Sequence, residues 1–167
     1  VSSYNGLINV ESVPNNGTIF TILLPTEKKA ATLQEIPKQE DPKTGGGNLL
    51  FIDDELTIVT TNRILLEKRG FKVAGFTDPV SALERFSENP QVFEAVLTDM
   101  TMPAMSGLEL AKKVRQIRSD IPVIICTGFS DIINEENFRS FGIDAILYKP
   151  VQLNEMVRTI SDLVQKK

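Results

Sequence analysis

The 167-residue chain contains no histidine, no tryptophan and a single cysteine, Cys126. Without an imidazole base the chain cannot form a Ser-His-Asp triad or a zinc site with histidine ligands. One cysteine cannot form an internal disulfide, which favours a reducing compartment. We expect Cys126 to be a small buried apolar residue. The chemistry of this chain must therefore come from carboxylates, hydroxyls and lysines.

Long apolar runs and an excess of positive charge are absent as well. No run reaches the roughly 18 residues that a membrane-spanning helix needs, and no signal peptide opens the chain, so we expect no direct membrane insertion. The formal net charge of -4 gives no general attraction to nucleic acid, so we expect no nucleic-acid partner.

The first 47 residues divide into two parts. Within residues 1–25, two runs that alternate polar and apolar residues, 7–10 and 18–24, flank the turn signal Pro14-Asn15-Asn16-Gly17. This pattern predicts a β-hairpin, which is marginal alone and so belongs to something larger. Residues 26–47 carry four lysines, four acids, two prolines and a glycine triplet, which predicts a flexible linker with at most a short helix at 30–34.

Residues 48–167 alternate between short apolar runs and segments with helical spacing. The runs of strand length are 49–52, 73–76, 95–97, 123–126 and 145–147. Asp78-Pro79 marks one helix start, Ser106 with Glu109 forms a capping box at another, and apolar residues recur at three and four positions over 153–164. Five strand–helix pairs predict an α/β fold with a doubly wound, five-stranded parallel sheet.

Polar residues follow four of the five expected strands. Asp53 and Asp54 follow the first, Asp99 the third, Thr127 the fourth and Lys149 the fifth. The ligand site of such a fold lies at the carboxyl ends of its strands, so these side chains should meet there.

The types of these residues indicate phosphoryl chemistry. Three carboxylates at one edge repel each other and need a cation, and oxygen ligands suit Mg²⁺ or Mn²⁺. Lys149 and Thr127 supply a point charge and a hydrogen-bond donor for a phosphoryl group. Asp99 could then act as the nucleophile and form an aspartyl phosphate.

Each residue also has a simpler interpretation. Asp54 could be a helix N-cap, and Asp99 could cap the turn ahead of Pro103. Lys149 could be an exposed residue at a strand end, and Thr127 with Gly128 could form only a turn. The joint placement at four strand ends favours the functional interpretation.

Together these motifs resemble the receiver domain of two-component response regulators. The matching residues over 48–167 are Phe51-Ile52-Asp53-Asp54-Glu55, the run Leu97-Thr98-Asp99-Met100-Thr101-Met102-Pro103-Ala104-Met105-Ser106-Gly107, Ile125-Cys126-Thr127-Gly128 and Tyr148-Lys149-Pro150. The resemblance implies a flavodoxin-like sheet with strand order 2-1-3-4-5. It also implies that Asp99 accepts a phosphoryl group from a phosphohistidine on a partner.

The resemblance implies a role for each remaining site residue. Asp54, Asp99 and the backbone carbonyl of Thr101 would bind Mg²⁺, with Asp53 acting mainly through water, and Thr127 and Lys149 would hold the phosphoryl oxygens. The sequence departs from the family at the position three residues before Lys149, where Ile146 replaces the usual aromatic switch residue. Tyr148 is adjacent to Lys149 instead, so we expect Ile146 to change its packing rather than swing a ring.

Residues 1–25 resemble the final strands of a histidine kinase ATP-binding domain, and the order of the parts resembles a hybrid sensor kinase. The resemblance implies a cytoplasmic receiver, whose parent protein could be membrane-anchored. Its partners would be a histidine kinase, or its own parent kinase core, and a histidine phosphotransfer protein. We expect no kinase activity, because the chain lacks the phosphorylatable histidine; it would catalyse only its own phosphorylation and dephosphorylation.

Two alternatives belong to other classes. A haloacid dehalogenase-type phosphatase also uses Asp, Thr and Lys with Mg²⁺, but its first strand ends in Asp-x-Asp, whereas Asp53 and Asp54 are adjacent here. The other alternative is a receiver-like docking module that is never phosphorylated.

Overall fold

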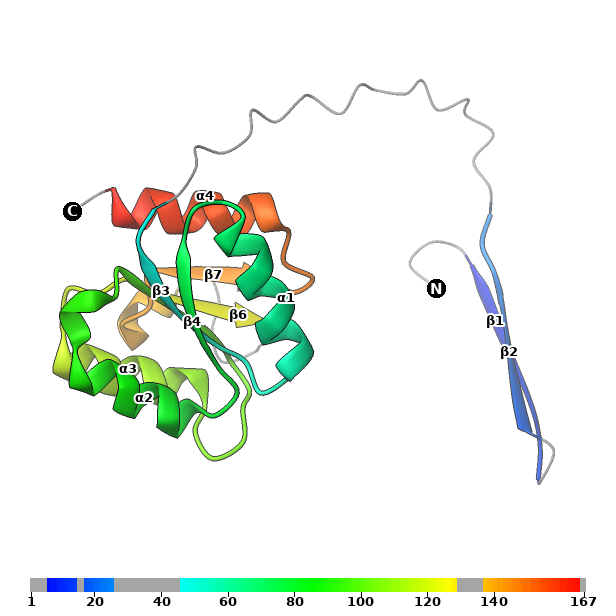
Figure 1. The fold of residues 1–167 in the computed structure, drawn as a ribbon. Helices are drawn as coiled ribbons and strands as arrows, with labels where there is room; N and C mark the ends of the chain where they lie inside the picture. Colours follow the sequence, from blue (N-terminus) through cyan, green and yellow to red (C-terminus); the bar gives the residue numbers. More distant parts are fainter. Residues whose placement is uncertain (1–5, 15–16, 26–45, 129–136, 166–167) are drawn as a thin grey trace, which may run out of the picture. The chain divides into compact units, whose positions relative to one another are not determined.

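The computed structural model describes residues 6–14, 17–25, 46–128 and 137–165 (Figure 1). The chain falls into two compact units, Val1–Lys38 and Gln39–Lys167. The first unit contains a two-stranded antiparallel sheet, and the second contains a five-stranded parallel sheet with its helices. The predicted linker, residues 26–47, lies outside the described residues except for Gly46 and Gly47, as does the short helix considered at 30–34.

The predicted β-hairpin is confirmed as strands β1 (Leu7–Val13) and β2 (Gly17–Leu23). Ile8 pairs with Ile22 and Val10 with Phe20, so these four apolar side chains share one face of the ribbon. Every residue of both strands is exposed. A ribbon with an uncovered apolar face cannot contribute much stability by itself.

The second unit contains the predicted parallel sheet. Its strands are β3 (Asn48–Ile52), β4 (Lys72–Phe76), β5 (Ala95–Asp99), β6 (Val123–Thr127) and β7 (Ala145–Tyr148). They pair in parallel in the order β4-β3-β5-β6-β7, which confirms the expected order 2-1-3-4-5. The central strands β5 and β6 are buried at every position, as a sheet covered on both faces requires.

Among the residues that the structure describes, four α-helices cover the two faces of this sheet: α1 (Leu56–Glu67), α2 (Pro79–Glu88), α3 (Gly107–Ile117) and α4 (Leu153–Val164) (Figure 1). One hydrophobic cluster joins the sheet to α2 and α3 and includes the fully buried Phe86 and Leu110. The other joins the opposite face to α1 and α4, through Leu66 and Ile160. The result is a three-layer fold with two cores.

Both predicted helix starts are confirmed. Asp78 caps α2 by accepting hydrogen bonds from the amides of Val80 and Ser81, at 3.3 and 2.9 Å. Ser106 and Glu109 form the reciprocal capping box of α3. The helical periodicity at the end of the chain is confirmed as α4, whose Met156, Val157 and Ile160 are buried. These local signals fix where the helices begin.

The connection from β6 to β7, where a helix is expected, is described only at Gly128 and from residue 137 onward. There it holds a short 3-10 helix, η3 (Phe138–Phe141), which ends at Gly142 in the left-handed conformation. Residues 129–136 lie outside the described residues. A second short 3-10 helix, η2 (Pro90–Val92), precedes β5. Among the described residues, no helix has both the length and the hydropathy that crossing a membrane requires.

Candidate functional site

The sheet topology places two aspartates side by side. From β3 the chain adds the next strand, β4, on one side and all later strands on the other, so the strand order reverses between the neighbours β3 and β5, and ligands of such sheets bind at this switch point. Ile52 pairs with Thr98, so Asp53 and Asp99 occupy the next position of each strand. Both are nearly enclosed, with 2% and 8% of their surfaces exposed. Two carboxylates at such low exposure require a positive partner.

Lys149, which directly follows the edge strand β7, provides that positive partner. Its Nζ lies 2.9 Å from Asp53 Oδ2 and 2.5 Å from Asp99 Oδ1. Strand β7 is separated from β5 by β6, about 10 Å at the usual strand spacing, so a long side chain is needed to reach this point. The structure therefore brings together Asp53, Asp99 and Lys149 from three strand ends, as the sequence predicts.

The electrostatics of this cluster favour a charged lysine. Burial alone lowers the pKa of Lys149, but its hydrogen bonds to Asp99 and Asp53 outweigh burial and raise that pKa above the usual lysine value. The cluster thus holds a permanent positive charge beside the Asp99 carboxylate.

Backbone amides fix the remaining carboxylate oxygens. The amide of Thr101 donates to Asp99 Oδ2 at 2.8 Å, and the amide of Glu55 donates to Asp53 Oδ1 at 3.0 Å. Each carboxylate is held by one amide and by Lys149. The orientation of Asp99 is therefore fixed before any ligand binds, which is how reactive groups are kept in position.

Thr127 ends β6 at the same edge of the sheet and is buried, with 4% of its surface exposed. Its backbone carbonyl accepts the amide of Lys149 at 2.7 Å. Among the described residues, the Thr127 hydroxyl has no hydrogen-bond partner. A hydroxyl can donate a hydrogen bond, and the role of Thr127 at the phosphoryl group stays a prediction.

Asp54 is the one predicted carboxylate that the structure does not join to this cluster. Its side chain is exposed, and within the described ranges it makes no ion pair or hydrogen bond with Lys149 or Asp99. It is not the N-cap of α1 either, since Glu55 holds that position. The role of Asp54 as a metal ligand stays a prediction.

The simpler interpretations of Asp99 as a turn cap and of Lys149 as an exposed strand-end residue explain only part of what the structure shows. Asp99 does cap a turn through the Thr101 amide, but it also contacts Lys149. Lys149 is not merely an exposed residue at a strand end, because it bridges two buried carboxylates. Asp99 therefore takes part in a turn and in an ion pair at the same time.

The chemistry of the donors fits a hard cation such as Mg²⁺. Asp53, Asp54, Asp99 and the Thr101 carbonyl offer only oxygen ligands, and the two carboxylates of Asp53 and Asp99 beside the one Lys149 ammonium leave an excess of negative charge. In the part of the chain that the structure describes, no three His, Cys, Asp or Glu side chains are already gathered in a metal-binding arrangement. The fit is therefore one of ligand chemistry and charge.

Sequence reasoning missed the structural importance of Gly107. A Cβ at this position would lie 2.3 Å from the backbone oxygen of Asp99, so only glycine lets α3 begin this close to the site. The Gly107 amide also donates to the Met100 carbonyl at 3.0 Å. A glycine at the first position of a helix, where better helix formers are available, was the one signal in the sequence.

The expected packing role of Ile146 has a structural basis. Ile146 is partly buried and packs against the cluster under α2 and α3, and Tyr148 is 41% exposed. Cys126 is buried as predicted, and its burial raises the pKa of the thiol to about 12. A thiol with this pKa is protonated at neutral pH and is a poor nucleophile.

A family model for the response regulator receiver domain matches residues 49–161. Sensor protein EvgS of Escherichia coli strain K12 is 32% identical over 171 residues, which cover 99% of this chain and 14% of EvgS. Response regulator receiver protein CpdR of Brucella abortus is 34% identical over 99 residues, 59% of this chain and 81% of CpdR.

Among solved structures, a response regulator receiver domain protein from Clostridium thermocellum has a TM-score of 0.68 and 32% identity, covering 72% of this chain and 95% of that one. The match to the family model covers more than half of the chain and includes every predicted site residue. It disfavours the phosphatase alternative. By its sequence and its fold, this chain belongs to the response regulator receiver domain family of two-component signal transduction.

Proposed function

We propose that this receiver takes a phosphoryl group from a phosphohistidine onto Asp99 and passes on the signal through a changed surface or by transfer to a phosphotransfer protein. The main support is that Lys149 and the Thr101 amide hold the two Asp99 oxygens at 2.5 and 2.8 Å. A carboxylate held in this way is a positioned nucleophile.

The transfer itself exchanges one bond for another. An Asp99 oxygen forms the new bond to phosphorus, the bond from phosphorus to the imidazole nitrogen breaks, and the imidazole takes up a proton from solvent. The Lys149 ammonium faces the negative charge of the phosphoryl oxygens, and the Thr127 hydroxyl can donate to one of them. The product is an acyl phosphate on Asp99.

Mg²⁺ would be held by Asp54, Asp99 and the Thr101 carbonyl, with Asp53 acting mainly through water. When bound, Mg²⁺ supplies positive charge that offsets the repulsion between these carboxylates and an incoming phosphate. The remaining roles belong to residues of this chain. Lys149 and the Thr101 amide orient the Asp99 carboxylate, and the Thr127 hydroxyl would donate a hydrogen bond to the phosphoryl group.

A surface next to the site suits a helical partner. Leu56 and Ile64 lie on one face of α1, eight residues apart, and are 68% and 49% exposed. They line a groove of about 380 Å³ between α1 and Gly75 on β4. We infer that a histidine kinase, or the chain's own parent kinase core, or a histidine phosphotransfer protein packs here. Leu56→Glu should then slow the phosphorylation of Asp99 by such a partner, but not by a small phosphodonor.

The relatives support a hybrid kinase as the parent. EvgS is named a sensor protein and LuxQ of Vibrio vulnificus, 26% identical, an autoinducer 2 sensor kinase/phosphatase, and this chain spans 14% and 18% of their lengths. We propose that residues 48–167 form the receiver, 26–47 a flexible linker and 1–25 the last strands of a kinase ATP-binding domain, in a cytoplasmic part of the parent. These 167 residues contain no histidine, so they cannot carry the phosphoryl donor and would catalyse only Asp99 phosphorylation and dephosphorylation.

The test is exposure of the full chain to a small phosphodonor such as phosphoramidate with Mg²⁺, followed by intact mass. We expect the mass of one phosphoryl group to be added to the wild type and to Asp162→Asn, a surface control on α4. Asp99→Asn should gain none. If the wild type also gains none, the chain is the non-phosphorylated docking module instead.

A further inference from the structure

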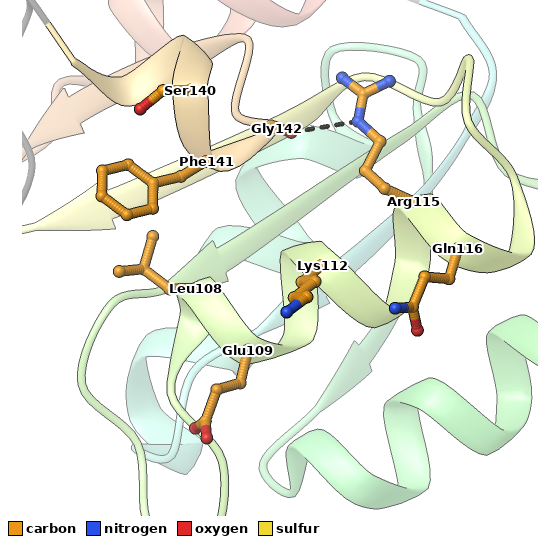
Figure 2. A pocket seen from close by; sticks show the side chains of 8 residues that line it. All are labelled: Leu108, Glu109, Lys112, Arg115, Gln116, Ser140, Phe141 and Gly142. Atoms are coloured by element: carbon orange, nitrogen blue, oxygen red, sulfur yellow. Dashed lines mark hydrogen bonds between the residues drawn. The ribbon is translucent and has the colours of Figure 1, made fainter.

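Two hollows of the receiver differ in what they can select. A groove of about 640 Å³ lies between α3 and the end of η3, where Figure 2 shows Arg115 held by the Gly142 carbonyl. Arg115 is also paired with Asp144, and the other two charged side chains of this lining, Glu109 and Lys112, have opposite signs. Such a lining favours no class of ligand. A second, smaller cavity is more selective.

The second cavity has a volume of about 200 Å³ and lies between the sheet and helices α1 and α4. Most of its lining is apolar, and Phe51, Cys126 and Met156 are each no more than 4% exposed. The apolar lining residues are Phe51, Ile58, Cys126, Pro150, Val151 and Met156. All of them except Pro150 belong to the hydrophobic cluster that joins the sheet to α1 and α4. An apolar molecule would therefore lose contact with water over much of its surface here.

The polar end of this cavity is the ion pair of Asp53 and Lys149. Lys149 Nζ lies 2.9 Å from Asp53 Oδ2. Asp99, the other partner of Lys149, is not among the residues that line the cavity. The cavity thus reaches the lysine from the side of α1 and α4, away from the carboxylate that we propose is phosphorylated.

The ion pair has hydrogen-bonding capacity left over. An ammonium group carries three hydrogens, and those of Lys149 serve Asp53 and Asp99, which leaves one for a further acceptor. Asp53 accepts from Lys149 and from the Glu55 amide, so its two oxygens can accept another hydrogen bond. A hydroxyl group, which both donates and accepts, matches this pair of needs.

The charge of the pair selects a neutral ligand. Asp53 and Lys149 balance each other within the lining, and only 2% of the Asp53 surface is exposed. A carboxylate on the ligand would meet Asp53, and an ammonium group would meet Lys149. Either charge would be taken out of water without an unshared partner, which is costly.

The volume of the cavity sets the size of the ligand. An engineered apolar cavity of about 150 Å³ in another protein holds benzene. A cavity of about 200 Å³ therefore has room for one six-membered ring with a short substituent.

We propose that this cavity binds a small neutral molecule that consists of one apolar ring and a hydroxyl group. The ring contacts the apolar lining, and the hydroxyl donates to Asp53 and accepts from Lys149. Binding needs neither Mg²⁺ nor a phosphoryl group, so it stands even if the chain is never phosphorylated.

The experiment uses the full, unphosphorylated chain labelled with ¹⁵N, without Mg²⁺, and three probes of similar size. Benzyl alcohol, benzylamine and benzoate share one ring and one added carbon and differ in the charge of the polar group. We expect benzyl alcohol to bind with a Kd of about 0.1–1 mM and to shift the amide signals of Phe51, Cys126 and Val151. Benzylamine and benzoate should each bind at least about tenfold more weakly.

Two valine variants locate the binding. Val151→Phe places a ring in the cavity and should weaken the binding of benzyl alcohol at least about tenfold. Val164→Phe is the matched control, because Val164 is also partly buried in the same hydrophobic cluster but does not line the cavity. It should change the affinity by no more than about twofold. Thermal unfolding checks that each variant is folded.

A charge variant tests the selection of a neutral ligand. Asp53→Asn removes the acid that opposes benzoate, so benzoate should bind to it at least about fivefold more tightly than to the wild type. The valine pair decides the proposal should Asp53→Asn not fold. Equal binding of the three probes, no binding of benzyl alcohol up to about 10 mM, shifts confined to other surfaces, equal effects of the two valine variants, or an unchanged benzoate affinity in folded Asp53→Asn would each overturn the proposal.

Discussion

At the scale of single residues, three charges decide the behaviour of the site. Asp53 and Asp99 are nearly buried and share the ammonium of Lys149. Like charges held close together destabilise the fold unless an opposite charge compensates them. Lys149 therefore stabilises this pair of carboxylates, and under the proposed function it would also face the phosphoryl group.

Replacing Lys149 by glutamine should lower the free energy of unfolding by about 1–3 kcal/mol at neutral pH, because two carboxylates lose their shared cation and the lysine itself is partly exposed. Urea unfolding measures this change. Adding Asp99→Asn should restore much of the loss, since one of the two repelling charges is then gone. A double variant less stable than Lys149→Gln would contradict this account.

The phosphorylation of Asp99 by phosphoramidate should be about 100-fold slower in Lys149→Gln than in the wild type. The control Lys72→Gln should be phosphorylated at the wild-type rate.

Asp78 gives a prediction about pH. Hydrogen bonds from the Ser81 hydroxyl, the Ser81 amide and the Val80 amide hold its pKa below the usual value of 3.8. A carboxyl group with a lowered folded pKa contributes stability that is fully present above its unfolded pKa and lost as the pH falls through the folded pKa. Asp78→Asn should therefore be less stable than wild type near pH 7, and the difference should shrink below pH 3.8.

Urea unfolding over this pH range provides the measurement. Glu84→Gln is the matched control, because Glu84 lies on the same helix but takes no part in the cap. It should leave the stability unchanged across the range. A difference for Asp78→Asn that stays constant with pH would show that the carboxylate charge does not stabilise the start of α2.

At the scale of elements, the start of α3 lies against the end of β5, the strand that carries Asp99. Gly107→Ala would ordinarily stabilise a helix, but here the new Cβ would lie 2.3 Å from the Asp99 backbone oxygen. We expect a loss of about 1–3 kcal/mol in the free energy of unfolding, as for other overpacked positions. Labelling of Asp99 should also slow, because the loop must move.

Gly46→Ala is the control for this substitution, since nothing lies within 4 Å of its added Cβ. Its stability should stay within about 0.5 kcal/mol of wild type. If Gly107→Ala were as stable as Gly46→Ala, the close approach of α3 to Asp99 would not constrain the site.

The elements also show what the sequence could and could not predict. Asp78, Ser106 and the apolar spacing over 153–164 act through neighbours within four residues, so the caps and α4 were predictable. The strand order was predictable because parallel strands joined by helices have few arrangements, and the family resemblance specified one. Helix α1 has no side-chain cap and exposes Leu56, which blurs its pattern.

Long-range contacts were the part of the site that local patterns could not supply. The alternation of strands and helices predicted that the four site residues Asp53, Asp99, Thr127 and Lys149 lie at one edge of the sheet. The bridge from Lys149 to the two carboxylates forms only because the fold brings together residues as far apart in the sequence as Lys149 and Asp53, which are separated by 96 positions. The separation of Asp54 from this cluster depends on where α1 begins. Neither contact leaves a periodic signal in the sequence.

At the scale of the whole molecule, the two units differ in what they can bury. All members of both hydrophobic clusters lie between Leu49 and Val164, so the receiver has its cores without the hairpin. The apolar hairpin face formed by Ile8, Val10, Phe20 and Ile22 is exposed by 50–65%. Apolar area of this kind is what a partner surface would cover if the hairpin belongs to an upstream domain, as proposed.

Deleting residues 1–45 should therefore leave the free energy of unfolding of the receiver within about 0.5 kcal/mol of that of the full chain, and should leave Asp99 labelling unchanged. Deleting residues 152–167 is the contrasting control: it removes Met156, Val157 and Ile160 from the core and should prevent folding. Circular dichroism during urea unfolding distinguishes these outcomes. A marked loss of stability on removing 1–45 would mean that the hairpin packs on the receiver, and the hairpin would then belong to this domain rather than to an upstream one.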